Sequence, residues 1–303
     1  MKRILFYIKE YARETNKTVF TASTIFVAFA IFINYHFGLN SAINALSEPR
    51  QYLGWLIVFL TAFLFAYVVQ ALFFQTTVFQ NKKALTLLFI GPAIFAWKMS
   101  YNLHFDLTDD AAQNAYWNHV VYWPLKLAIV TGALYLVWLF YDRKEQPFYG
   151  TDTKDFKAGP YFIMLLIMVP LIAAASTQPD FLAMYPKLKN VQHLASQNSN
   201  GIYKLLYELS YGSDFFSIEL FFRGFLVLAF AKWVGKDAIL PMAIFYCTIH
   251  FGKPLGECIS SFFGGLLLGI VTYNTRNIFG GLIVHLGIAW LMELGGYLGN
   301  WYK

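Results

Sequence analysis

The amino-acid sequence predicts an all-α fold, a polytopic transmembrane helical bundle of about nine spans. Hydrophobic residues make up 58% of the 303 residues and charged residues only 13%, whereas about a quarter of the residues in soluble domains are charged. Several apolar runs approach the ~20 residues that a helix needs to cross a bilayer. The ~10-residue alternating segments of a transmembrane barrel do not occur. Helices are therefore the expected spanning elements.

The first predicted element is an amphipathic helix within residues 1–17, whose apolar face could rest on the membrane surface. Five apolar runs follow and look like scaffold, because they contain few ionisable residues. Four further runs, which carry more polar groups, complete the bundle. In chain order the predicted spans cover residues 19–37, 52–75, 84–101, 120–141, 160–176, 214–234, 238–251, 255–273 and 279–298.

These elements divide the chain into three predicted segments. Residues 1–176 hold the amphipathic helix and five scaffold spans, residues 177–213 form an extramembrane loop with an interfacial helix, and residues 214–303 form a four-helix core. A lid over a cavity is the alternative interpretation of the loop, since long loops beside sites often gate them. Loops predicted on the N-terminal side carry roughly twice as many lysines and arginines as the opposite loops, so we expect a cytoplasmic N-terminus.

Ionisable side chains within the last four spans are the main functional signal. A charge at the bilayer centre costs at least ~2.5–3.5 kcal/mol, so such groups usually pair inside a bundle and mark a site. In the sixth span Glu219 and Arg223 are four residues apart with the acid first, the favourable order for a helical ion pair. A purely structural salt bridge would also explain this pair. In either case we expect Arg223 to position Glu219.

The seventh span ends on His250, and Tyr246 lies four residues earlier on the same helix face. A lone histidine in an apolar helix is more often a satisfied core residue than a base. Here, however, Lys253 and Glu257 follow around one tight turn. The short turn predicts that His250 and Glu257 lie near each other.

The eighth span contains an FxxGxxxG pattern formed by Phe262, Gly265 and Gly269. Small residues at this spacing predict close packing of a neighbouring helix. In the ninth span His285 and Glu293 are eight residues apart and share a helix face. The four spans together therefore offer histidines and carboxylates, which are suitable for general acid–base chemistry.

Histidine and glutamate are also zinc ligands. A metal bound by His250, His285 and a glutamate therefore stays open as an alternative, although the specific HExxH motif is absent. We expect no other cofactor. The +6 net charge is not an argument for a nucleic-acid partner, because most basic residues flank the apolar runs.

Spans six to nine together resemble the CPBP family, the CAAX-protease and bacteriocin-processing (Abi) intramembrane proteases. The family motifs are EExxxR, aromatic-xxx-His, FxxGxxxG and HxxxN, in this order. The matching stretches are Ile218-Glu219-xxx-Arg223, Tyr246-xxx-His250, Phe262-xx-Gly265-xxx-Gly269 and His285-xxx-Ala289. The resemblance covers roughly the last third of the chain and implies a protease-like core there.

Two positions depart from the family pattern. Ile218 stands where the first glutamate belongs, and Ala289 stands where the asparagine belongs. In the family, that glutamate is thought to activate the attacking water, and the asparagine is thought to stabilise the oxyanion. Asp214, one turn before Ile218, and Glu293, one turn beyond Ala289, could replace them.

The resemblance and the spacing lead to one catalytic hypothesis. His250, with Glu257 or Glu219, activates water, and His285 helps to hold the oxyanion. The supporting residues in this hypothesis are Arg223, Glu293, Asp214 and Tyr246.

The resemblance implies an intramembrane endopeptidase that cleaves a membrane-associated protein or peptide. A catalytically inactive relative, which binds partner subunits in a membrane complex as a scaffold, is the alternative. A proton- or ion-coupled transporter would also use buried glutamate and histidine, but the broken, inverted halves of many transporters are not evident. We expect the protein in the bacterial inner (plasma) membrane.

Overall fold

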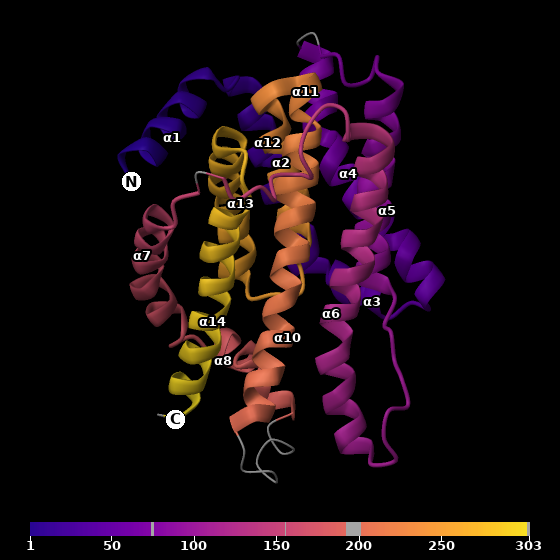
Figure 1. The fold of residues 1–303 in the computed structure, drawn as a ribbon, viewed down its shortest axis with the longest axis vertical. Coiled ribbons are helices and arrows are strands. Elements are labelled where there is room, and N and C mark those ends of the chain that lie inside the picture. Colours follow the sequence, from indigo (N-terminus) through magenta and orange to yellow (C-terminus); the bar gives the residue numbers. More distant parts are fainter. Residues whose placement is uncertain (74–75, 155, 192–200, 302–303) are drawn as a thin grey trace. The chain divides into compact units, whose positions relative to one another are not determined.

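A computed structural model describes the chain except residues 74–75, 155, 192–200 and 302–303. Every regular element of the described part is a helix (Figure 1), which confirms the all-α fold class. The chain forms two compact units. Unit 1 comprises Met1–Asn102, Ala133–Lys154 and Leu220–Ile278, and unit 2 comprises Leu103–Gly132, Asp155–Glu219 and Phe279–Lys303.

Long apolar helices confirm that this is an integral membrane protein. Within the described residues five helices are long and apolar enough to cross a bilayer: Lys17–Phe37, Glu48–Phe73, Gln113–Asp142, Leu255–Thr275 and Phe279–Trp301. The apolar helix Gly159–Ala175 is shorter. The expected total of about nine spans stays a prediction.

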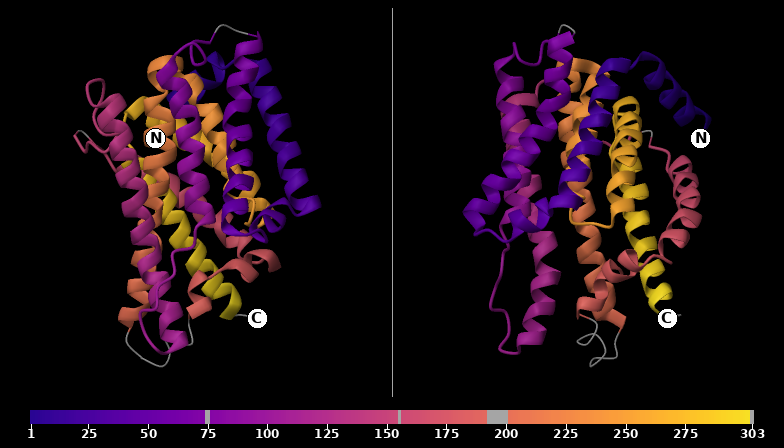
Figure 2. Two further views of the ribbon diagram at one scale, coloured as in Figure 1. Left: turned by 90° about the vertical axis from the view of Figure 1, so that its right-hand side faces the viewer. Right: turned by 180° about the vertical axis from the view of Figure 1, so that it is seen from behind.

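Unit 1 is built around a short helix, α12 (Ile239–Thr248), which contacts α2, α4, α13 and η3. The other elements of the unit are α1 (Lys2–Glu14), α2 (Lys17–Phe37), α3 (Leu39–Asn44), α4 (Glu48–Phe73), α5 (Lys82–Ser100), η1 (Trp138–Asp142), η3 (Leu220–Ala229), α11 (Ala231–Val234), η4 (Gly235–Ala238) and α13 (Leu255–Thr275). Helices α4 and α5 lie side by side (Figure 2). The helix α6 (Ala111–Val137) begins in unit 2 and ends in unit 1.

Aromatic side chains fill the core of unit 1. The ring of Phe245 on α12 lies 4.8 Å from that of Phe59 on α4 and 5.2 Å from that of Phe222 on η3. Phe95 on α5 lies 4.9 Å from Phe221. All of these rings are almost completely buried. Such contacts add to the burial of large apolar surfaces, and they hold α12 and η3 in place.

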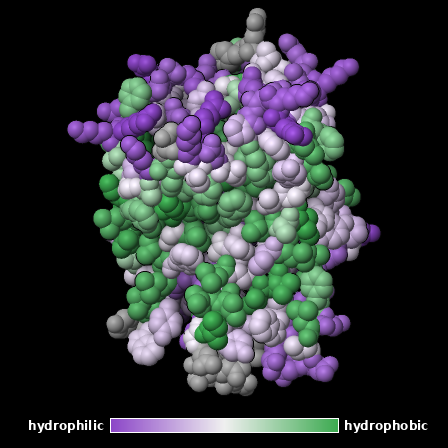
Figure 3. Space-filling view, in the orientation of Figure 1, coloured by the Kyte–Doolittle hydropathy of each residue, from purple (hydrophilic) through white to green (hydrophobic). Residues whose placement is uncertain are grey.

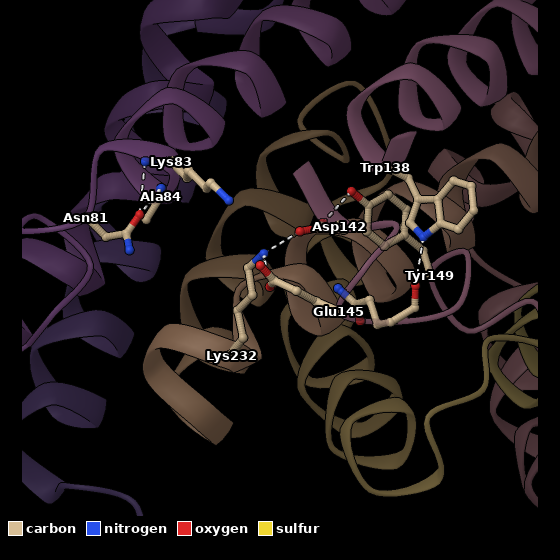
Figure 4. A network of polar contacts seen from close by, with 9 residues as sticks. Asn81, Lys83, Ala84, Trp138, Asp142, Glu145, Tyr149 and Lys232 are labelled. Atoms are coloured by element: carbon tan, nitrogen blue, oxygen red, sulfur yellow. Dashed lines mark hydrogen bonds and ion pairs between the residues drawn. The ribbon is translucent and has the colours of Figure 1, made fainter. Parts of the chain in front are cut away.

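The loops predicted on the N-terminal side of the membrane meet at one end of unit 1. Lys236 pairs with Glu14 at the end of α1, and the Thr77 hydroxyl donates to the Trp233 carbonyl oxygen at 2.8 Å. Lys232 pairs with Asp142, as Figure 4 shows. Hydrophilic side chains cover this end, where α11 lies, in Figure 3. These segments of unit 1 therefore share one side, as the alternation of the predicted spans requires.

The N-terminal helix α1 differs from its prediction. The sequence indicated that its apolar face could rest on the membrane surface. In the structure Ile4, Tyr7 and Tyr11 are buried, and α1 contacts α13. Protein surface competes with lipid for an apolar helix face, and the sequence pattern is the same for both. Leu5 and Phe6 remain exposed.

Unit 2 is organised around α14 (Phe279–Trp301), which contacts three other helices. These are α7 (Gly159–Ala175), α8 (Pro179–Met184) and α10 (Gly201–Glu219). A short 3-10 helix, η2 (Lys187–Val191), contacts α10. Glycines let the helices approach α14: a Cβ on Gly287 would lie 2.5 Å from the Leu165 side chain of α7. The small-residue packing expected in membrane bundles is thus present.

Three element boundaries differ from the predicted ones. Helix α10 starts at Gly201 and continues into η3, so the predicted interfacial helix and the sixth span form one helical stretch. Helix α6 starts at Ala111, between the predicted spans 84–101 and 120–141. Helix α12 has ten residues, all buried, and at 1.5 Å per residue such a helix is about half as long as the hydrocarbon core is thick. Residues 192–200 of the predicted loop or lid lie outside the described part, and the three-segment division stays a prediction.

Candidate active site

The first candidate residues lie where an α-helix changes into a π-helix. Glu219 is the last residue of α10, and Arg223 belongs to the ten-residue π-helix η3. Both side chains are completely buried. π-Helical turns are rare and occur frequently at functional sites. The irregular backbone therefore coincides with the motif that the sequence singled out.

In unit 2, Glu219 and His285 form a buried pair. The His285 Nδ1 lies 2.9 Å from the Glu219 Oε1, and the His285 side chain is 13% exposed. The Phe215 ring packs edge-on against the imidazole, with 4.7 Å between the ring centroids. Because an ionised carboxylate can only accept, the pairing makes Nδ1 the donor to Glu219. The structure thus brings together two of the four predicted catalytic residues.

In unit 1, Arg223 lies over the ring of Tyr246. The guanidinium carbon is 4.1 Å from the ring centroid, which is a close cation–π contact. The ring also packs against Gly265, where an added Cβ would lie 3.0 Å from the Tyr246 Cδ1. The FxxGxxxG pattern predicted that a helix comes close to these glycines. The structure confirms this and identifies the helix as α12, since Gly269 faces Met242 in the same way.

His250 lies in the turn that follows α12. Its Nδ1 is 3.0 Å from the Tyr246 carbonyl oxygen, and a carbonyl can only accept, so Nδ1 carries the proton and Nε2 has the lone pair. Two residues of α2 hold the turn: Asn34 donates to the Phe251 carbonyl oxygen at 2.8 Å, and Tyr35 donates to the Lys253 carbonyl oxygen at 2.6 Å. These contacts therefore fix the turn and the orientation of the His250 ring.

Glu257 lies in the first turn of α13. Its Oε1 is 3.5 Å from the Lys253 Nζ. Both side chains are partly exposed, and the positive end of the helix dipole also favours an acid at this position. The role of Glu257 as the acid beside His250 stays a prediction.

A comparison with known protein families finds a match for the segment that contains most of these residues. Residues 214–291 match the family model described as Type II CAAX prenyl endopeptidase Rce1-like. This segment is Rce1-like. No curated protein and no solved structure matches the chain. The match confirms the resemblance to the CPBP family that the four motifs indicated, and it covers about a quarter of the chain.

The Rce1-like segment contains every candidate site residue except Glu293. Glu293 is buried on α14, where its carboxylate accepts from the backbone N–H groups of Lys187 at 2.8 Å and Leu188 at 3.4 Å. A carboxylate that accepts backbone N–H groups at the start of a helical turn acts as a cap. Glu293 therefore anchors η2, a task that the sequence did not indicate.

Asp214, at the start of the Rce1-like segment, also has a local contact. Its Oδ1 accepts from the Ser217 hydroxyl at 3.0 Å, within α10. Each of the two acids that the sequence offered as a replacement for a missing family residue thus has a structural contact of its own. In the described part of unit 2, Glu219 contacts the motif histidine His285.

Among the described residues, no three histidine, cysteine, aspartate or glutamate side chains are arranged to hold a metal ion. The two cysteines, Cys247 and Cys258, are buried with 4.0 Å between their sulfur atoms and help to pack α12 on α13. Sequence reasoning missed Asn34 and Phe215, which orient the turn of His250 and the ring of His285. Asn34 and Phe215 belong to none of the four motifs, so only the tertiary contacts reveal them.

Proposed function

We propose that this protein is an intramembrane endopeptidase of the CPBP type, which hydrolyses a peptide bond of a membrane-associated protein or peptide. The Rce1-like match and the long apolar helices support this class of enzyme. The observation that carries the proposal is the contact between the buried Glu219 and the partly buried His285. A structural protein gains little from such a pair, because burying ionisable groups is costly.

The Glu219–His285 pair has the chemistry that amide hydrolysis needs. Glu219 accepts a hydrogen bond from the Nδ1–H group, so it holds the His285 ring in one tautomer. The carboxylate also offsets the positive charge of the ring when Nε2 is protonated. A protonated Nε2 can donate to the oxyanion that forms on the scissile carbonyl. One such donor typically contributes about 10²–10³-fold to the rate.

Water activation is assigned to His250 in this proposal. Its Nδ1 donates to the Tyr246 carbonyl oxygen, so Nε2 is the ring nitrogen that can accept a proton when the imidazole is neutral. The water oxygen bonds to the carbonyl carbon, one water proton passes to Nε2, and that proton then goes to the leaving amine as the carbon–nitrogen bond breaks. Glu257, which follows His250 around the same turn, would assist this base, as one form of the sequence hypothesis predicted.

The location of the protein is part of the proposal. The lysines and arginines of the loops predicted on the N-terminal side support a cytoplasmic N-terminus, and the proposed location is a bacterial inner membrane. Substrates would then be proteins or peptides held in or on that membrane.

Terminal proteomics of membranes tests the proposal. Cells that lack the gene would receive the wild type, Glu219→Gln or His285→Ala, and the protein termini in their membranes would be quantified by mass spectrometry. Matched controls are Glu208→Gln, on the same helix as Glu219, and His119→Ala, whose ring Nδ1 lies 2.8 Å from the Ala115 carbonyl oxygen. We expect termini that the wild type and both controls generate, and that fall about 10²-fold or more in the two site variants at equal expression.

The scaffold alternative keeps one specific observation in its favour. Ile218 and Ala289 replace two family residues. If no terminus depends on Glu219 or His285, and deletion of the gene instead lowers the amounts of other membrane proteins, the chain acts as a scaffold and the endopeptidase proposal is wrong.

A further inference from the structure

The helix α14 begins with two adjacent glycines, Gly280 and Gly281, and the second lies one helical turn before His285. Residues four apart lie on the same helix face. The surface next to the His285 side chain is therefore bare backbone at Gly281. Alanine is the better helix former, so helix propensity does not explain a glycine here.

The Glu219 carboxylate occupies the space that this glycine leaves. A Cβ built on Gly281 would lie 2.3 Å from the Glu219 Oε2 and 3.2 Å from its Cδ. Real Cβ atoms essentially never come within 3.0 Å of another heavy atom. The other oxygen of the same carboxylate, Oε1, lies 2.9 Å from the His285 Nδ1. Gly281 and His285 thus bracket the carboxylate along one face of α14.

Relief of this clash would require the Glu219 carboxylate to move. Glu219 is completely buried, and a buried carboxylate that leaves its hydrogen-bond donor loses much of the stabilisation of its charge. A methyl group at position 281 would push on Oε2, and the rigid carboxylate would transmit this push to Oε1. The contact with His285 would lengthen or break.

The neighbouring glycine performs a different task. A Cβ on Gly280 would lie 2.1 Å from the ring of Tyr161, so Gly280 admits a side chain of α7. Gly280 therefore serves helix packing, whereas Gly281 faces the acid of the candidate site.

We propose that Gly281 is a positioning residue, which sets the place of the Glu219 carboxylate so that it can hold the His285 ring. The consequence for catalysis rests on the proposed function. The placement of the carboxylate itself does not, and the two can be tested separately.

The test compares Gly281→Ala, Glu219→Asp and the double variant as full-length protein in nanodiscs. Aspartate is one methylene shorter, so it gives the new methyl group room. We expect Gly281→Ala to lose at least tenfold in the cleavage that the wild type performs, and we expect the same substitution to cost less in the Glu219→Asp background. Gly264→Ala is the matched control, because nothing lies within 4 Å of a Cβ at that helical position.

Nuclear magnetic resonance of ¹⁵N-labelled histidine supplies a readout that needs no activity. The downfield Nδ1 proton signal of His285, assigned with His285→Ala, reports the hydrogen bond to Glu219. It should be lost in Gly281→Ala and remain in Gly264→Ala, with the fold of both checked by circular dichroism. An unchanged signal in Gly281→Ala would overturn the positioning proposal. If no form of the protein, the wild type included, cleaves any membrane protein while the signal responds as expected, the proposed function fails and the positioning role stands.

Discussion

Replacing Asp142 with asparagine removes a negative charge that the fold of unit 1 uses at its polar end. Asp142 is completely buried, accepts from the Tyr149 hydroxyl at 2.7 Å and pairs with Lys232 (Figure 4). Asparagine has nearly the same shape, so the change isolates the charge. This network joins η1, which contains Asp142, to α11, which contains Lys232 and follows η3 in the chain.

The magnitude follows from the burial of each partner. Breaking a fully buried pair costs about 3–5 kcal/mol, but Lys232 is 20% exposed and has a second partner, Glu145, at 2.8 Å. Hydrogen bonds to charged groups contribute about 1.5–3 kcal/mol. We therefore expect Asp142→Asn to lower the free energy of unfolding by about 2–3 kcal/mol.

Denaturant titration of the purified protein in detergent, followed by circular dichroism, measures this loss. Glu145→Gln is the matched control, because Glu145 pairs with the same lysine but is 45% exposed. An exposed pair contributes about 0–1 kcal/mol. If Glu145→Gln destabilises the protein as much as Asp142→Asn does, burial does not govern this network and the reasoning is refuted.

Three further predictions follow from single contacts. Gly265→Val should displace the Tyr246 ring and lower the free energy of unfolding by about 1–3 kcal/mol through overpacking; the same denaturant titration checks this, and Gly264→Val should cost less. Glu293→Ala leaves backbone N–H groups at η2 without their acceptor, so limited proteolysis should cut near η2 faster than in the wild type, at equal rates elsewhere. Asn34→Ala removes the donor to the Phe251 carbonyl oxygen and should lower the free energy of unfolding by about 1–3 kcal/mol. Amide hydrogen exchange should become faster only in the turn after α12. Protection of this turn equal to that of the wild type would show that other contacts hold it.

The glycine motif shows how far the sequence reaches. The spacing of Gly265 and Gly269 predicted that a helix approaches closely, because only small residues allow it. The partner could not be predicted, since any helix face could fill the groove. The structure identifies α12 and, in particular, the Tyr246 ring. Local spacing thus predicts that a contact exists, and the tertiary structure decides with what.

The acids of the site show where sequence reasoning ends. The sequence offered Glu257 or Glu219 as the partner of His250. It offered Asp214 and Glu293 as replacements for the two missing family residues. The structure of unit 2 pairs Glu219 with His285 and uses Glu293 as a cap for η2. Hydrogen-bond partners far apart in the chain depend on helix rotation and packing, which a one-dimensional pattern does not contain.

The sequence by itself determined the membrane class, the all-α fold and the Rce1-like segment, because lipid demands long apolar helices and because motif spacing is a local property. Only the tertiary structure decided that α1 packs on α13 and that the Glu219 carboxylate lies against Gly281. It also decided that α12 has ten residues, fewer than a helix needs to cross a bilayer. The physical reason is the same in each case. Apolar surface, helix length and bare glycine backbone acquire a specific partner only when distant segments are packed together.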